Sequence, residues 1–185
     1  MMNVSTLGRH LSVLLLASAA LSGTAHAAGQ GNLGATSTGT VTINASVPQQ
    51  VRISGLSDVN FINADPNLEA ANAQNVCVWS NNANRRYNIV ASGSGTSGAF
   101  TIGSGTLPAI PYSVEWDDVS GATTGTALAT GAALGGQTSA ATKSLCQDLT
   151  AESASLIVRI ASADLQDMQA SAAYTGTLTL TVAPE

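Results

Sequence analysis

The chain has 185 residues, of which 44% are hydrophobic, 9% charged and 4% aromatic, and its formal net charge is −5. One domain is the natural expectation at this length. The charged fraction lies far below the ~25% typical of soluble domains. Six basic residues are too few to neutralise a nucleic-acid backbone, so we expect no nucleic-acid partner.

The first 27 residues have the pattern of a secretory signal peptide. A stretch containing Arg9 precedes an apolar run over residues 11–21, and a small-x-small triplet follows at 25–27. The apolar run is shorter than the ~20 residues that span a bilayer. We therefore expect cleavage after Ala27 and export through the inner membrane.

Cleavage at this point removes both histidines of the chain and leaves 158 residues (185 less 27), with five basic and eleven acidic side chains. Without histidine, Ser–His and Cys–His catalysis is excluded, and the commonest transition-metal ligand is missing. We expect no catalytic residues, no metal and no cofactor. A hydrolase that uses carboxylates stays conceivable, but no residue pattern supports it.

Cys77 and Cys146 are the only cysteines in the sequence. In an oxidising compartment an even number of cysteines indicates pairing. A bridge between them would close a loop of roughly 70 residues and stabilise the fold by about 4 kcal/mol in the chain-entropy model. The alternative, a reactive thiol, lacks a histidine or another nearby base.

Alternation of apolar and polar residues, the period of a β-strand, recurs along the chain. The clearest run covers residues 40–47, is interrupted by Pro48 and resumes at 51–53. Residues 76–91 predict a β-hairpin, and 163–173 predict one helical turn. Further strand patterns lie at 59–61, 100–102, 112–116, 126–129, 155–160 and 174–182. Many short strands without a long amphipathic helix indicate an all-β sandwich.

The N-terminal strand pattern has unusual surroundings. Residues 28–39, before it, are rich in Gly, Ser and Thr and predict a flexible arm, and Pro48 follows it. A regular apolar face on a loosely tethered strand suits insertion into another sheet, the donor-strand form of β-augmentation. The alternative is an ordinary first strand of the same domain.

Three stretches resemble the pilin subunits of chaperone–usher fimbriae in Gram-negative bacteria, most closely the alpha (colonisation-factor) and archaic classes. In those pilins an alternating strand ends at a proline and leads into the body, as residues 40–48 and 51–53 do here. The stretches 107–116 and 173–182 are similar to a strand ending in tryptophan and to a C-terminal Tyr-x-Gly strand. The cysteine pair departs from the alpha class, whose subunits often lack cysteine.

The resemblance implies an immunoglobulin-like Greek-key β-sandwich that lacks its last strand. It implies a signal peptide at 1–27, an arm with a donor strand at 28–47 and a pilin domain at 48–185. A periplasmic chaperone would cover the open groove until, at the outer-membrane usher, the next subunit's donor strand replaces it. The product would be an extracellular adhesive fimbrium built from copies of this chain or other pilins. The implied donor residues are Val41, Ile43, Ala45 and Val47, and the implied groove-lining residues are Leu178, Leu180 and Val182.

A self-contained secreted module that binds carbohydrate or another surface is the alternative function. Trp79, Trp116 or Tyr112 would form its aromatic platform, and Asp117 and Asp118 would supply polar contacts or Ca²⁺ ligands. In that case the strand at 40–47 would pair within its own sheet.

Overall fold

A computed structural model describes residues 28–146 and 153–185, so the expected signal peptide lies outside the described residues. The chain divides into two units, Met1–Ser46 and Val47–Glu185. In the first unit Gly29 and Thr40 form an antiparallel bridge, each N–H donating to the other's carbonyl at 2.8 and 2.9 Å. Residues 41–50 are all exposed and carry no strand assignment. The expected strand at 40–47 is thus not formed, because a strand requires a hydrogen-bonded neighbour.

Within the described residues, the second unit contains ten strands, one short α-helix and two 3-10 helices at Ala83–Arg85 and Thr96–Gly98. The helix, α1 (Ser162–Gln166), falls where one helical turn is expected. No described helix has the length and apolar character needed to cross a membrane. The strands are β1 (Val51–Ser54), β2 (Ala70–Ser80), β3 (Arg86–Gly93), β4 (Thr101–Ile102), β5 (Ile110–Pro111), β6 (Ser113–Asp117), β7 (Thr126–Ala127), β8 (Ala133–Thr138), β9 (Ala154–Ile160) and β10 (Leu178–Pro184).

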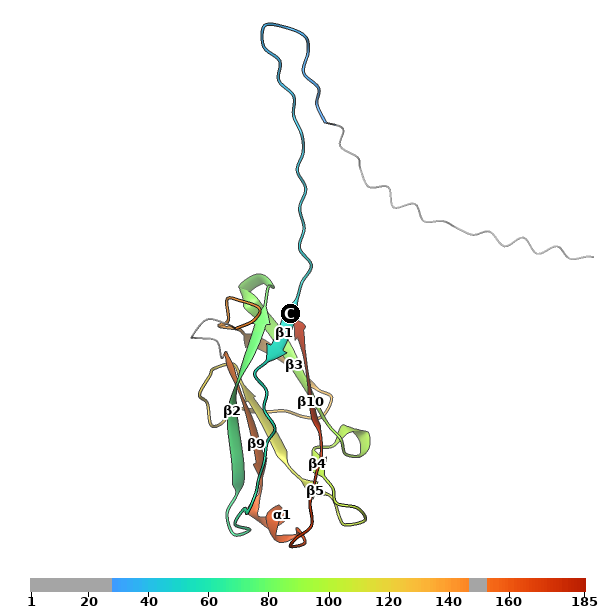
Figure 1. Cartoon of the computed structure of the whole chain (residues 1–185), viewed down its shortest axis with the longest axis vertical. Coiled ribbons are helices and arrows are strands. Elements are labelled where there is room, and N and C mark those ends of the chain that lie inside the picture. The colour runs from blue at the N-terminus through green and yellow to red at the C-terminus, as the bar shows by residue number, and fades with distance from the viewer. Residues whose placement is uncertain (1–27, 147–152) are drawn as a thin grey trace, which may run out of the picture. The chain divides into compact units, whose positions relative to one another are not determined.

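The strands form two larger antiparallel sheets and one small pair (Figure 1). One sheet has the order β1-β2-β9-β6-β7, the other has the order β10-β3-β8, and β4 pairs with β5. Inward-facing residues of both larger sheets share one core. Val76 and Val78 of β2 and Tyr87 and Ile89 of β3 are all 0% exposed. The expected all-β class is confirmed.

The expected hairpin over residues 76–91 is wrong, because β2 and β3 belong to different sheets. The turn between them begins at Asn82, whose side chain accepts a hydrogen bond from the Ala83 N–H at 2.8 Å. Asn84 and Arg85 follow with φ values of +56°. This compact turn carries the chain from one layer to the other, so its two flanking strands do not pair.

Strand β8 has no counterpart among the expected strands. Its sequence, ALGGQT, carries two glycines where apolar residues would mark the period. The register with β3 shifts opposite these glycines, and Gly136 adopts a φ of +75°. Such a bulge needs a residue that tolerates positive φ. The glycines interrupt the alternation of apolar and polar residues, so the sequence pattern does not predict this strand.

A buried hydrogen bond lies at the centre of the core. Trp116 and Tyr87 are 1% and 0% exposed, and the Trp116 Nε1–H donates to the Tyr87 hydroxyl at 3.1 Å. Burial raises the pKa of Tyr87 from its usual value of 10.0 to about 12, because the phenolate would lose its hydration. The folded state therefore favours the neutral phenol.

We expect this burial to make the protein lose stability in alkali. The contribution is complete below pH 10, and it is lost as the pH rises from 10 towards 12, because the unfolded chain releases the phenol proton first. The loss should be on the order of 2–3 kcal/mol, read from urea unfolding between pH 8 and 11.5. Tyr87→Phe should flatten this pH dependence and cost about 1–3 kcal/mol at neutral pH. An unchanged alkaline slope in this variant would contradict the assignment.

Cys77 and Cys146 form the expected disulfide, with Cα atoms 6.2 Å apart and a sequence separation of 69. The bridge ties the segment after β8 to the buried middle of β2. It joins parts of the chain that are otherwise distant in sequence, so it restricts the unfolded ensemble strongly.

Replacing both cysteines by alanine should lower the free energy of unfolding by about 4 kcal/mol in urea titrations. Dithiothreitol should destabilise the wild type by a similar amount and leave the double variant unchanged. A loss below about 1 kcal/mol would show that the bridge contributes little.

Candidate functional site

A groove of about 1130 Å³ with an apolar floor lies beside β10. Its floor is formed by Leu156, Val158 and Ile160 of β9, which are 3%, 6% and 2% exposed. These residues face inward because they alternate along the strand. Leu165 of α1 and Met168 close one end together with Ile102 and Tyr112.

One side of the groove is the wall segment, residues 55–69, which runs from β1 towards β2. The expected strand at 59–61 does not form here, although Val59 and Phe61 are half-buried against the core. Leu56 and Ile62 are 47% and 76% exposed and lie at the groove. The wall segment therefore packs through alternate side chains without belonging to a sheet.

Two side-chain amides hold the wall segment in place. Gln74 of β2 accepts a hydrogen bond from the Ser57 N–H at 2.8 Å and donates to the Ser57 carbonyl at 3.0 Å. Gln166 of α1 donates to the Pro66 carbonyl at 3.3 Å. The Gln74 amide thus makes the pair of hydrogen bonds that a neighbouring strand would otherwise supply.

The other side of the groove is β10. This strand pairs with β3 along its whole length, and no strand among the described residues pairs with its other edge. Leu178, Leu180 and Val182 all pack against the main core. Leu178 and Leu180 also line the groove, whereas Val182 does not line it and lies towards the end of β10 that β1 contacts.

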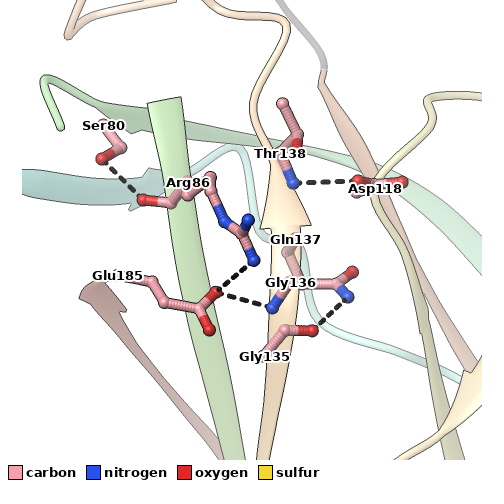
Figure 2. Close-up of polar contacts among 8 residues, drawn as sticks. All are labelled: Ser80, Arg86, Asp118, Gly135, Gly136, Gln137, Thr138 and Glu185. Carbon is pink, nitrogen blue, oxygen red and sulfur yellow. Dashed lines mark hydrogen bonds and ion pairs between the residues drawn. The ribbon is translucent and has the colours of Figure 1, made fainter. Parts of the chain in front are cut away.

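Glu185 anchors the end of β10 across β3 (Figure 2). Its N–H donates to the Arg86 carbonyl at 3.3 Å, and its Oε2 accepts a hydrogen bond from the Gly136 N–H at 2.6 Å. The same oxygen lies 3.7 Å from Nη2 of Arg86. A Cβ at Gly135 would meet Oε1 of Glu185 at 2.9 Å, so the bulge glycines make room for this carboxylate.

The acidic cluster near Trp116 serves structural contacts. Glu115 accepts from the Gly125 N–H at 2.9 Å and lies 3.3 Å from Nε of Arg159. Asp117 accepts from the Val119 N–H, and Asp118 accepts from the Thr138 N–H at 2.9 Å (Figure 2). Within the described part of the chain, no three His, Cys, Asp or Glu side chains gather in a way that could hold a metal.

The aromatic residues considered for a sugar platform are not grouped on one accessible face. Trp116 is buried in the core. Tyr112 packs against Phe100 with ring centroids 5.7 Å apart, and burial raises the pKa of its hydroxyl. Trp79 is half-buried on β2. With Trp116 out of reach, the geometry does not favour a carbohydrate-binding platform.

The implied donor residues are all exposed. Val41, Ile43 and Val47 are 75%, 87% and 79% exposed, and Ala45 is also exposed. Residues 40–47 contain no charged side chain. Among the described residues that line the groove, Asp58 is the one charged side chain. The segment and the groove are therefore both almost uncharged, and the apolar face of the segment matches the apolar floor of the groove.

Comparison with known proteins adds no relative. The chain matches no model of a known protein family, and no curated protein matches it significantly. The function must be argued from the groove itself.

Glu185 allows the anchoring of β10 to be tested. Glu185→Ala should lower the free energy of unfolding by about 1 kcal/mol and speed amide exchange at residues 181–183. The reason is that the last residue pairs between β10 and β3 lose the hydrogen bond that links them to β8. Glu185→Gln keeps an acceptor for the Gly136 N–H and should recover at least half of the loss. Equal effects of the two variants would assign the contribution to the Arg86 ion pair.

Proposed function

We propose that this protein is a structural pilin subunit that polymerises by donor-strand complementation. The observation that carries the proposal is the apolar groove beside the unpaired edge of β10. An extended segment placed there would hydrogen-bond to this edge and bury side chains on the β9 floor. An unpaired edge beside an exposed apolar surface is a ready site for strand addition.

Residues 41–47 of a second copy are the proposed occupant. Their apolar side chains alternate, so one face can enter the groove while Thr42, Asn44 and Ser46 face outward. The segment has seven residues, the same number as β10, and would pair with the part of its edge that borders the groove, at Leu178 and Leu180. Its exposed apolar face and lack of charge match the almost uncharged groove.

The proposal extends to assembly and location. Each copy would give its segment to one neighbour and receive a segment from another, a heterologous contact that does not close and so builds a filament. The finer fold would be the incomplete immunoglobulin-like Greek-key sandwich of chaperone–usher pilins. A periplasmic chaperone would protect the groove before an outer-membrane usher brings copies together on the cell surface.

Two aspartate substitutions on opposite faces of the donor segment test the proposal. Ile43→Asp would bury a carboxylate in the apolar groove at a cost of several kcal/mol, so it should reduce assembly at least about 100-fold. Thr42→Asp adds the same charge to the outward face and should leave assembly nearly intact. The purified chains are compared by size-exclusion chromatography and negative-stain microscopy.

Filaments formed equally well by all three chains would contradict the proposal. So would a stable, soluble monomer of the wild type with residues 40–47 paired in its own sheet, which would favour the self-contained binding module. A filament lost in both variants would point to a general effect of charge on the arm.

A further inference from the structure

We propose that Gln74 is a positioning residue that holds the groove open by tying the wall segment to β2. This inference rests on the proposed function, because it concerns the site that would receive the donor strand. It starts from the two hydrogen bonds between the Gln74 amide and the Ser57 backbone.

The wall segment has another place where it could dock. Its half-buried residues Val59 and Phe61 alternate with the exposed residues Asn60 and Ile62, which is the burial pattern of a strand with one face towards a core. The edge of β10 across the groove pairs with no strand in the described part of the chain and carries the apolar residues Leu178 and Leu180. If the wall segment moved onto this edge, it would fill the groove from within the same molecule.

Gln74 opposes this movement from the far side of the groove. It lies on β2 directly opposite Leu156 of β9, so its side chain starts on the inner face of the sheet. From there its amide satisfies both the N–H and the carbonyl of Ser57 on the β2 side. Those backbone groups are then unavailable to β10, and the groove between the wall segment and β10 stays open.

The tether is local, and this separates its role from general stability. Ser57 is exposed, so water can replace the two hydrogen bonds when the amide is removed. Gln74→Met keeps the length and volume of the side chain and removes both bonds. We expect a small effect on global unfolding but a large effect on where the wall segment rests.

The test uses the chain carrying Ile43→Asp, which cannot donate its own segment, and a synthetic peptide of residues 38–49 as the probe. Gln74→Met should weaken peptide binding about tenfold or more, measured by fluorescence anisotropy. Gln74→Glu keeps the acceptor for the Ser57 N–H and should retain part of the affinity, and it serves if the methionine variant folds poorly. Asn75→Ala is the matched control, because Asn75 accepts from the Gly121 N–H at 2.8 Å through its own amide oxygen and does not line the groove.

Hydrogen exchange of the peptide-free protein provides the decisive second readout. In Gln74→Met the amides of residues 178–181 that point away from β3 should gain protection, because the wall segment pairs with that edge of β10. Simple loss of stability would instead speed exchange throughout the molecule. Unchanged exchange on β10, or peptide binding equal to that of the parent chain, would overturn the role of Gln74. If the parent chain itself fails to bind the peptide, the proposed function falls, while exchange on β10 still decides whether Gln74 restrains the wall segment.

Discussion

The groove depends on one constraint: β10 is hydrogen-bonded to β3 along one edge, and its other edge pairs with no strand among the described residues. Backbone N–H and C=O groups need partners when water is displaced from them. The floor beside this edge is buried and apolar. A single side chain cannot both hydrogen-bond to the backbone of β10 and cover this floor. An extended segment with alternating side chains can do both, which is why we propose a strand as the occupant of this site.

The two edge strands of the three-stranded sheet, β10 and β8, differ in how their outer backbone groups are covered. At β8, the Ser139 N–H donates to the carbonyl of Arg85, while the preceding Thr138 N–H points the other way and is capped by Asp118. A carboxylate on an edge amide blocks the approach of another strand and repels acceptors. At β10 no carboxylate of this kind covers the edge among the described hydrogen bonds. One edge of the sheet thus has an amide covered by a carboxylate, and the other has none among the described hydrogen bonds. Under the proposed function, this difference would give assembly a direction.

Alternation was sufficient to predict the all-β class and most of the strands, because period two reports which side chains face a core. It could not assign β2 and β3 to different sheets, since alternation carries no information about pairing partners. It failed at β8, where two glycines accommodate the bulge and the Glu185 carboxylate. Alternation also predicts a strand at Val59 and Phe61, which are half-buried in the structure but pair with no neighbouring strand.

The candidate site was predictable in part. Alternation predicts that Leu178 and Leu180 share one face of a strand, and only the resemblance to pilins implies that this face lines a groove. The floor on β9 and the wall segment become one groove only through the tertiary fold. The role of Gln74 is not predicted, because its side chain contacts the backbone of Ser57, 17 residues away in the sequence. A signal was present, since Asn72 and Gln74 occupy inward-facing positions of β2 where the same strand later buries Val76 and Val78. Polar residues at core-facing positions mark a place where the backbone of another segment needs a partner.

The way in which Gln74 contacts Ser57 has a consequence for sequence variation. The amide binds the backbone N–H and carbonyl of Ser57 and makes no use of its hydroxyl. Any residue with a free N–H can therefore stand at position 57 without breaking the tether, whereas proline cannot. Position 74 tolerates far less, because few side chains offer both an acceptor and a donor at that reach. Among descendants of this chain, selection on the groove should fix the amide and leave the residue that it holds free to drift.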